Sequence, residues 1–129
     1  MKDYLAGNYN LAGPEFADYV KLFGDTELAA DAQYYLGEIF YQQKQYPQAI
    51  SAFDQVLERY SEGKKTADAH YKKGLALLKQ GRRDAAAKEF REVIRKFPNS
   101  PAASQAAAEL KGLGLSAGRP APPKSIRRK

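Results

Sequence analysis

Apolar residues recur along the chain with a helical spacing, and the same spacing appears three times. In the segment QYPQAISAF at residues 45–53 an apolar stripe begins that continues to Tyr60 at positions i, i+1, i+4, i+7, i+8 and i+11. The stripe returns 37 residues later, with Phe90 in place of Phe53, and a weaker copy lies 37 residues earlier at Phe16. This spacing puts the apolar positions on one face of an amphipathic α-helix. The sequence therefore predicts one such helix in each copy of a 37-residue unit.

A second helical pattern precedes this stripe within the unit. It runs from about residue 28 to 43 and again from about 66 to 80, with small residues alternating with large ones. Gly37 and Gly74 occupy the same place in these two helices, although glycine in a helix interior costs about 1 kcal/mol relative to alanine. We therefore expect both glycines to mark places where the following helix packs too closely for a side chain.

Turn residues separate the predicted helices. KQYP at 44–47 and GRRD at 81–84 indicate tight turns within a unit, with Pro47 in the first turn of the second helix. FPNSP at 97–101 ends one unit, and we expect Ser100 to cap the next helix and Pro101 to be its first residue. The alanine-rich residues 100–113 then form a closing helix without a partner.

The pattern as a whole predicts an all-α fold of stacked helical hairpins, because one hairpin cannot bury its apolar face alone. We assign residues 1–115 to one repeat domain, with a truncated first repeat at 1–24, repeats at about 25–61 and 62–98, and a capping helix at about 100–113. Met1 aligns with the middle of a first helix, so we expect the array to begin upstream of it. Residues 116–129 are predicted to be a basic disordered tail.

The helical unit resembles a known repeat. A glycine and a large residue in the first helix, followed by Tyr46, Ala49 and Phe53, resemble the tetratricopeptide repeat, whose standard period is about 34 residues. The segment DAQYYLGEIFY at 31–41 and the junction FPNSPAASQAAAEL at 97–110 resemble the C-terminal domain of the periplasmic Tol-Pal accessory family. The outer-membrane barrel-assembly lipoproteins have similar junctions, and such a lipoprotein or another periplasmic peptide-binding adaptor remains an alternative. NLAGPEF at 10–16 and Ser61, which stands where the family has proline, depart from the pattern.

The resemblance implies a tetratricopeptide α-solenoid, a right-handed superhelix of antiparallel helix pairs with a period of 37 residues. It also implies a non-enzymatic interaction scaffold in the bacterial periplasm, which couples Tol-Pal constriction of the outer membrane to peptidoglycan synthesis during cell division. The implied partners are a TolA-type envelope protein and a peptidoglycan synthase. Family members carry an N-terminal coiled coil that is absent from this sequence, and oligomerisation through it is an expectation of the resemblance.

The resemblance also implies a partner-binding groove, since the first helices line the concave side of such a stack. Counting from Gly37 and Gly74, the second, fifth, ninth, twelfth and thirteenth positions of the motif face this side. The predicted groove consists of Tyr4, Asp31, Tyr34, Glu38, Tyr41, Gln42, Asp68, Tyr71, Leu75, Leu78 and Lys79. Tyrosines give a large contact area at little entropic cost, which suits an extended or helical peptide. The alternative is that these tyrosines pack between helices.

The net positive charge of the chain lies mainly near its C-terminus. The chain of 129 residues carries a net charge of +6, but residues 114–129 hold five basic residues and no acidic one, so the remainder carries 6 − 5 = +1. A nucleic-acid binder that acts through this tail is therefore an alternative from another class. It is not favoured, because no aromatic residue interleaves with the basic ones. No apolar run is long enough for a membrane span.

Catalytic chemistry has little support in the sequence. His70 is the single histidine and cysteine is absent. No nucleophile motif, phosphate-binding glycine loop or cluster of metal ligands appears. A lone histidine on a helix is more often structural than a base or a metal ligand. We therefore predict no enzymatic activity, no cofactor and no bound metal.

Overall fold

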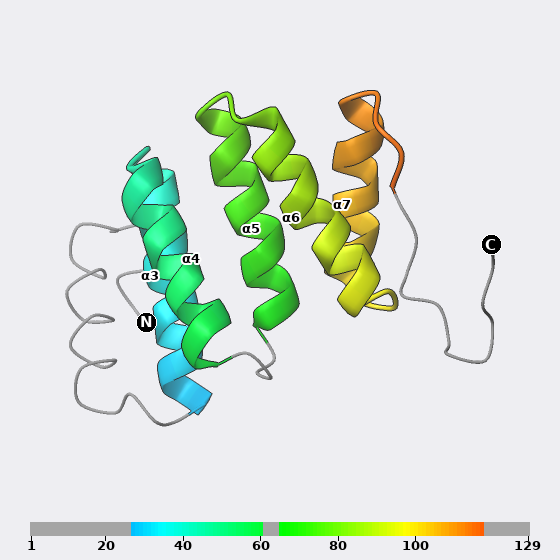
Figure 1. The fold of residues 1–129 in the computed structure, drawn as a ribbon. Helices are drawn as coiled ribbons and strands as arrows, with labels where there is room; N and C mark the ends of the chain where they lie inside the picture. Colours follow the sequence, from blue (N-terminus) through cyan, green and yellow to red (C-terminus); the bar gives the residue numbers. More distant parts are fainter. Residues whose placement is uncertain (1–26, 61–64, 118–129) are drawn as a thin grey trace.

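The computed structural model describes residues 27–60 and 65–117, which form five α-helices (Figure 1). These helices are α3 (Glu27–Gln42), α4 (Tyr46–Arg59), α5 (Thr66–Lys79), α6 (Arg83–Lys96) and α7 (Pro101–Gly112). The bounds of α3, α5 and α7 differ by at most one residue from those predicted. The truncated first repeat at 1–24 lies outside the described residues.

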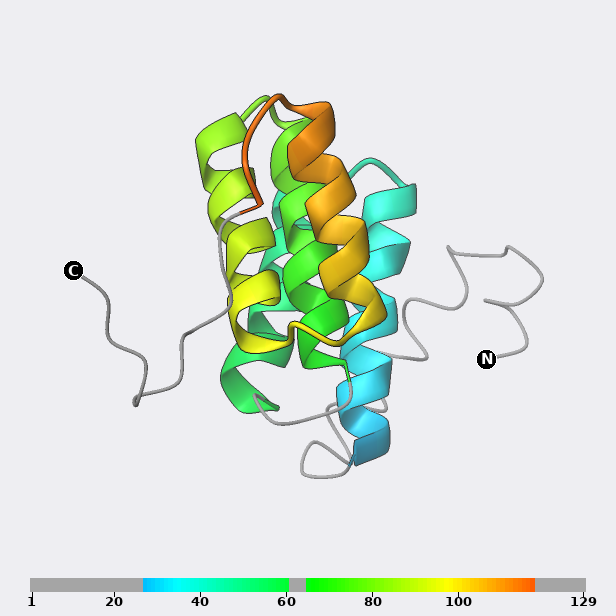
Figure 2. The same cartoon turned by 90° about the vertical axis from the view of Figure 1, so that its right-hand side faces the viewer.

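The helices lie in two layers (Figure 2). Helices α3, α5 and α7 form one layer, called the first-helix layer here, and α4 and α6 form the second-helix layer. Helix α4 contacts both α3 and α5, and α6 contacts both α5 and α7. Each second helix is therefore held by its own hairpin and by the first helix of the next unit, which confirms the predicted stacking of hairpins.

Two buried clusters form the core, and each is shared between neighbouring units. The first contains Phe53 and Val56 of α4 together with Ala69 of α5. The second contains Phe90 of α6 together with Ala106 of α7. Both phenylalanine side chains are 0% exposed. Burial of a phenylalanine stabilises the folded state by about 1.5–3 kcal/mol, so these rings are the main apolar contacts between helices.

The two helical glycines make room for these rings. A Cβ atom built on Gly37 would lie 2.5 Å from Cε1 of Phe53, a distance that real Cβ atoms essentially never show. Gly74 faces Phe90 in the same way. The close approach that the sequence predicted at both glycines is therefore confirmed.

The helices of the first-helix layer all end in the same turn. After α3, the backbone N–H of Gln45 donates to the carbonyl of Phe40 at 2.9 Å, and that of Lys44 donates to the carbonyl of Tyr41 at 2.9 Å. This pair of hydrogen bonds defines a Schellman motif, in which one residue adopts the left-handed conformation. Glycines with φ of 78° fill that position after α5 and α7, whereas Lys44 has φ of 62°.

The predicted caps are also present. The hydroxyl of Ser100 accepts a hydrogen bond from the backbone N–H of Ala103 at 3.1 Å, and Pro101 is the first residue of α7. Pro47 lies in the first turn of α4. Proline suits this position because its missing N–H would have no helical partner there.

Beyond α7, residues 113–117 turn back along α6, and we call them the C-terminal strap. Arg83 of α6 donates a hydrogen bond to the carbonyl of Leu113 at 2.9 Å. Arg91, also of α6, donates two bonds of 3.2 Å to the carbonyl of Ser116. The side chains of Leu113, Leu115 and Ala117 pack against the core around Phe90. Residues 116 and 117, which the sequence assigned to the tail, are thus held on α6, and residues 118–129 lie outside the described part.

We predict that Phe53→Ala lowers the free energy of unfolding by about 3–5 kcal/mol, because it empties the shared core. Gly37→Ala is also expected to destabilise the fold, since its new methyl group meets the Phe53 ring. The double variant should lose less free energy of unfolding than the sum of the two single losses, because the alanine at position 53 leaves room for the methyl group at position 37. Urea denaturation measures all three. Gln55→Ala, on the exposed face of α4, is the control, and strictly additive losses would contradict this packing.

We predict that Lys44→Gly raises the free energy of unfolding by about 0.5–1 kcal/mol. The left-handed conformation costs an L-residue about 1–2 kcal/mol, and the larger unfolded-state entropy of glycine offsets part of the gain. Gly81→Ala, at the equivalent turn, should lower the free energy of unfolding, since Gly81 has φ of 78°. Thermal melts of both variants test the pair, and a destabilised Lys44→Gly protein would argue against the left-handed turn.

Candidate peptide-binding surface

Tyr34 lies at the inner side of the first-helix layer. Its side chain is 5% exposed, and its ring centroid is 5.8 Å from that of Phe53. Its hydroxyl donates a hydrogen bond of 3.3 Å to Oε2 of Glu38, one turn further along α3. The predicted groove is corrected at this position, because the ring fills the space between α3 and α4 and belongs to the core.

Two other predicted tyrosines of the layer are half-buried, and one of them bonds a carboxylate of α7. The hydroxyl of Tyr71, on α5, donates a hydrogen bond of 3.1 Å to Oε2 of Glu109, on α7. The ring of Tyr41, on α3, stands edge-on to that of Tyr46 at 5.4 Å between centroids. We call Tyr41, Tyr71 and Glu109 the tyrosine–glutamate cluster.

The charge of Glu109 affects the pKa of both tyrosines. Burial raises the pKa of Tyr71 to about 12, with further contributions from the charge and hydrogen bond of Glu109 and from Tyr41. Burial also raises the pKa of Tyr41, to which Tyr46 and Glu109 add. Both phenols are therefore neutral at physiological pH. They present aromatic surface and hydroxyl groups, and they do not serve as bases.

A second contact joins α3 to α5 in the same layer. Nζ of Lys72 lies 3.2 Å from Oε2 of Glu38. Lys72 and Glu109 are 37 residues apart, and each directly follows the fifth position of the motif. The groove was predicted from other motif positions, so it did not include these two residues. The 37-residue period would have found them, because this position reaches back to the first helix of the preceding unit in each case.

The other predicted groove residues differ in their exposure. Leu75 and Leu78 are half-buried and pack against the core around Phe90. Gln42 and Lys79 are exposed at the ends of their helices. Asp31 and Asp68 are half-buried near the starts of α3 and α5, and Tyr4 lies outside the described residues.

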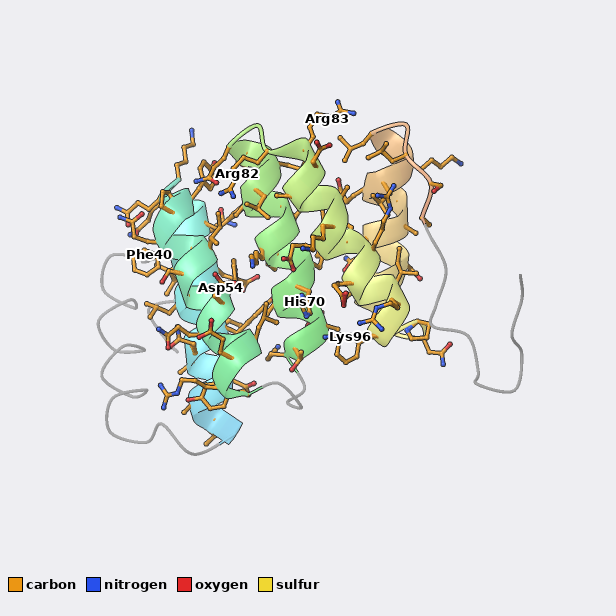
Figure 3. All side chains as sticks on the ribbon, viewed as in Figure 1. Phe40, Asp54, His70, Arg82, Arg83 and Lys96 are labelled. Carbon is orange, nitrogen blue, oxygen red and sulfur yellow. The ribbon has the colours of Figure 1, made fainter. Side chains whose placement is uncertain are left out.

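His70 belongs to a charged network between α4, α5 and α6 (Figure 3). Its Nδ1 lies 2.9 Å from Oε1 of Glu89, whose other oxygen is 3.2 Å from Nζ of Lys73. Lys73 also contacts Asp54 at 2.7 Å. Burial alone would raise the pKa of Glu89, but His70 and Lys73 outweigh it and lower the pKa.

The preceding repeat unit has a comparable contact at the place equivalent to His70. Gln33, which lies 37 residues before His70, donates a hydrogen bond of 3.1 Å to the carbonyl of Ala52, which lies 37 residues before Glu89. Both side chains thus join the first helix to the second at the same place in the hairpin. His70 therefore links α5 to α6 as Gln33 links α3 to α4. Among the described residues no cluster of potential ligands could hold a metal ion, and no helix there is long and apolar enough to cross a bilayer.

Stacked antiparallel helix pairs with one continuous layer of first helices define a helical-repeat protein. A family model described as the tetratricopeptide repeat matches residues 4–64, 44–101 and 71–115. The chain belongs to the tetratricopeptide repeat family. No curated protein matches it. The predicted all-α tetratricopeptide solenoid is thereby confirmed, and repeats of this kind favour an interaction scaffold that binds other proteins on its extended surface.

We predict that Glu109→Gln lowers the pKa of Tyr71 from about 12 towards its ordinary value of 10.0. The raised pKa means that neutral Tyr71 favours folding, and this contribution is lost as pH rises from about 10 to about 12. Phenolate absorbance in the ultraviolet gives the titration, and the difference from Tyr71→Phe assigns it. Alkaline stability should fall less steeply in Glu109→Gln. An unchanged titration would show that the hydrogen bond between these residues is not formed.

Proposed function

We propose that this chain is a non-enzymatic scaffold that binds an extended or helical segment of a partner protein on its first-helix layer. The observation that carries the proposal is the tyrosine–glutamate cluster, in which Tyr71 of α5 bonds Glu109 of α7 and the charge of Glu109 also acts on half-buried Tyr41 of α3. Membership of the tetratricopeptide family supports the same class of function.

The chemistry of the cluster indicates what a bound segment would need. Tyrosine rings give contact area with few rotatable bonds, so little side-chain entropy is lost on binding. The carboxylate of Glu109 already accepts the hydroxyl of Tyr71 and retains capacity for a donor from the partner. Exposed Gln42 and Lys79 supply polar contacts at the edge of the surface. A segment with one apolar side chain for Tyr41 and one donor for Glu109 meets these conditions.

We further propose that the scaffold works in the bacterial periplasm, where it coordinates Tol-Pal constriction of the outer membrane with peptidoglycan synthesis during cell division. The support for this setting is the resemblance of DAQYYLGEIFY at 31–41 and FPNSPAASQAAAEL at 97–110 to the Tol-Pal accessory family. The proposed partners are a TolA-type protein and a peptidoglycan synthase. Outer-membrane barrel assembly is the alternative setting, because its lipoproteins have similar junctions.

The test is capture of partners from an envelope extract by the immobilised chain, followed by affinity measurement with the purified partner. We predict that Tyr41→Ala weakens binding about fivefold or more, as expected for a tyrosine at the centre of an interface. Gln55→Ala, exposed on the second-helix layer, is the matched control and should bind as the unchanged chain does. Tyr34 is unsuitable as a probe, because its loss would damage the core.

The identity of the captured protein tests the setting separately from the surface. TolA-type and synthase proteins would support coordination of constriction, and barrel-assembly proteins would support the alternative. A purified partner that binds Tyr41→Ala with undiminished affinity, while circular dichroism shows a folded variant, would contradict the proposed binding surface.

A further inference from the structure

The first-helix layer contains two equivalent interfaces, one between α3 and α5 and one between α5 and α7. In the α3–α5 interface, Nζ of Lys72 lies 3.2 Å from Oε2 of Glu38. The residues 37 positions later are Glu109 and Leu75. The α5–α7 interface therefore has a carboxylate where the other has an ammonium group, and a leucine where the other has the pairing carboxylate. In the described part of the chain, Glu109 accepts a hydrogen bond from Tyr71 and forms no ion pair with a lysine or arginine.

A second lysine accompanies the tyrosine of the α3–α5 interface and has no counterpart in the α5–α7 interface. Nζ of Lys65, just before α5, lies 4.9 Å from the ring centroid of Tyr34 and 5.1 Å from that of Tyr35. An ammonium group over the face of an aromatic ring is attracted by the ring. The residue 37 positions after Lys65 is Ala102, whereas the residue 37 positions after Tyr34 is Tyr71. Tyr71 therefore lacks the lysine that accompanies Tyr34.

The negative charge of Glu109 acts on both tyrosines of the cluster. Burial raises the pKa of Tyr41 and of Tyr71, and the charge of Glu109 raises both further. A nearby cation would lower these pKa values, and no basic group of the described residues contributes to either shift. The fold thus leaves the charge of a half-buried carboxylate uncompensated, which costs free energy that a bound cation would recover.

We propose that the tyrosine–glutamate cluster binds the positively charged side chain of a lysine or arginine in the partner segment. This inference rests on the proposed function and names the chemical group that the same surface recognises. The partner's cation pairs with Glu109 as Lys72 pairs with Glu38 within the chain. Its alkyl stem lies against the rings of Tyr41 and Tyr71, as the stems of long basic side chains do on apolar surface.

The carboxylate of Glu109 has room for this cation among its hydrogen bonds. The hydroxyl of Tyr71 donates to Oε2, and an ionised carboxylate has about four acceptor sites on its two oxygens. An acidic side chain at the same place would be repelled by Glu109, so the site discriminates between partner segments by charge. The cation supplied by the partner thus completes an interface that the chain completes for itself between α3 and α5.

The test is selection of random peptides displayed on phage against the immobilised full chain, and the selected peptides are expected to share a lysine or arginine. A selected peptide is then synthesised with a fluorophore, and fluorescence anisotropy gives its affinity. Glu109→Gln keeps an oxygen acceptor for Tyr71 and removes the charge. It is expected to weaken binding about tenfold, which corresponds to the loss of one interaction with a charged group. Circular dichroism checks that the variant is folded.

Replacing the basic residue of the peptide with glutamine is expected to weaken binding by a similar factor. The two losses should not add, because each removes one partner of the same contact. Glu58→Gln, exposed on α4 in the second-helix layer, is the matched control, since it removes one negative charge elsewhere. This control should bind the peptide as the unchanged chain does, and an equal loss in it would overturn the inference, because net charge alone would then attract the peptide.

The remaining outcomes separate this inference from the proposed function. Selected peptides that share no basic residue, yet bind more weakly to Tyr41→Ala, would overturn the cation site and leave the proposed binding surface in place. Additive losses in Glu109→Gln and the glutamine peptide would also overturn the cation site, since the two groups would then act at different places. Selection of no peptide, or binding that neither Tyr41→Ala nor Glu109→Gln weakens, would overturn the proposed binding surface as well.

Discussion

The contact of one phenylalanine with one glycine sets the geometry of each hairpin. Phe53 lies against Gly37 and Phe90 against Gly74, so close that neither glycine could carry a side chain. A ring placed there is buried only when the first helix of the next unit covers it, and α5 and α7 provide that cover. A hairpin of this kind exposes apolar surface when alone, so stability comes from neighbouring units together. The continuous layer of first helices, and therefore any surface on it, follows from this requirement.

The period fixes positions in space while leaving their chemistry free to change. Gln33 and His70 join their hairpins at equivalent places, one through a carbonyl and the other through a carboxylate. Lys72 and Glu109 lie at equivalent places in successive first helices with opposite charges, and both contact the preceding first helix. Packing tolerates such changes because each of these polar side chains has a hydrogen-bond or ion-pair partner. These positions can therefore differ from unit to unit, whereas Phe53, Phe90 and the glycines that they face are committed to packing.

Much of the fold could be predicted from the sequence, because helical periodicity, glycine position and capping residues act locally. The first helices, the Ser100 cap and the two glycine contacts are examples. The candidate site was less predictable, since it depends on which side of a helix meets its neighbour. Tyr34 and Tyr71 share a motif position, and each ring lies 5.8 Å from the phenylalanine of its own hairpin. The hydroxyl of Tyr34 bonds Glu38 of its own helix, whereas that of Tyr71 bonds Glu109 of the next first helix. Glu109 was missed because no motif position marks a contact between units. The strap was missed because its hydrogen bonds use backbone carbonyls, which leave no sequence pattern.

The strap covers part of the core of the last described unit. Helix α7 closes with the same Schellman turn that leads into α4 and α6 in the earlier units. After this turn the described chain continues as the strap, whose Leu115 and Ala117 cover part of the core around Phe90. Arg83 and Arg91 satisfy its carbonyls, which in a helix would accept from the helix itself. These two guanidinium groups therefore hold the strap on α6 while keeping their own positive charge, because a carbonyl carries no net charge.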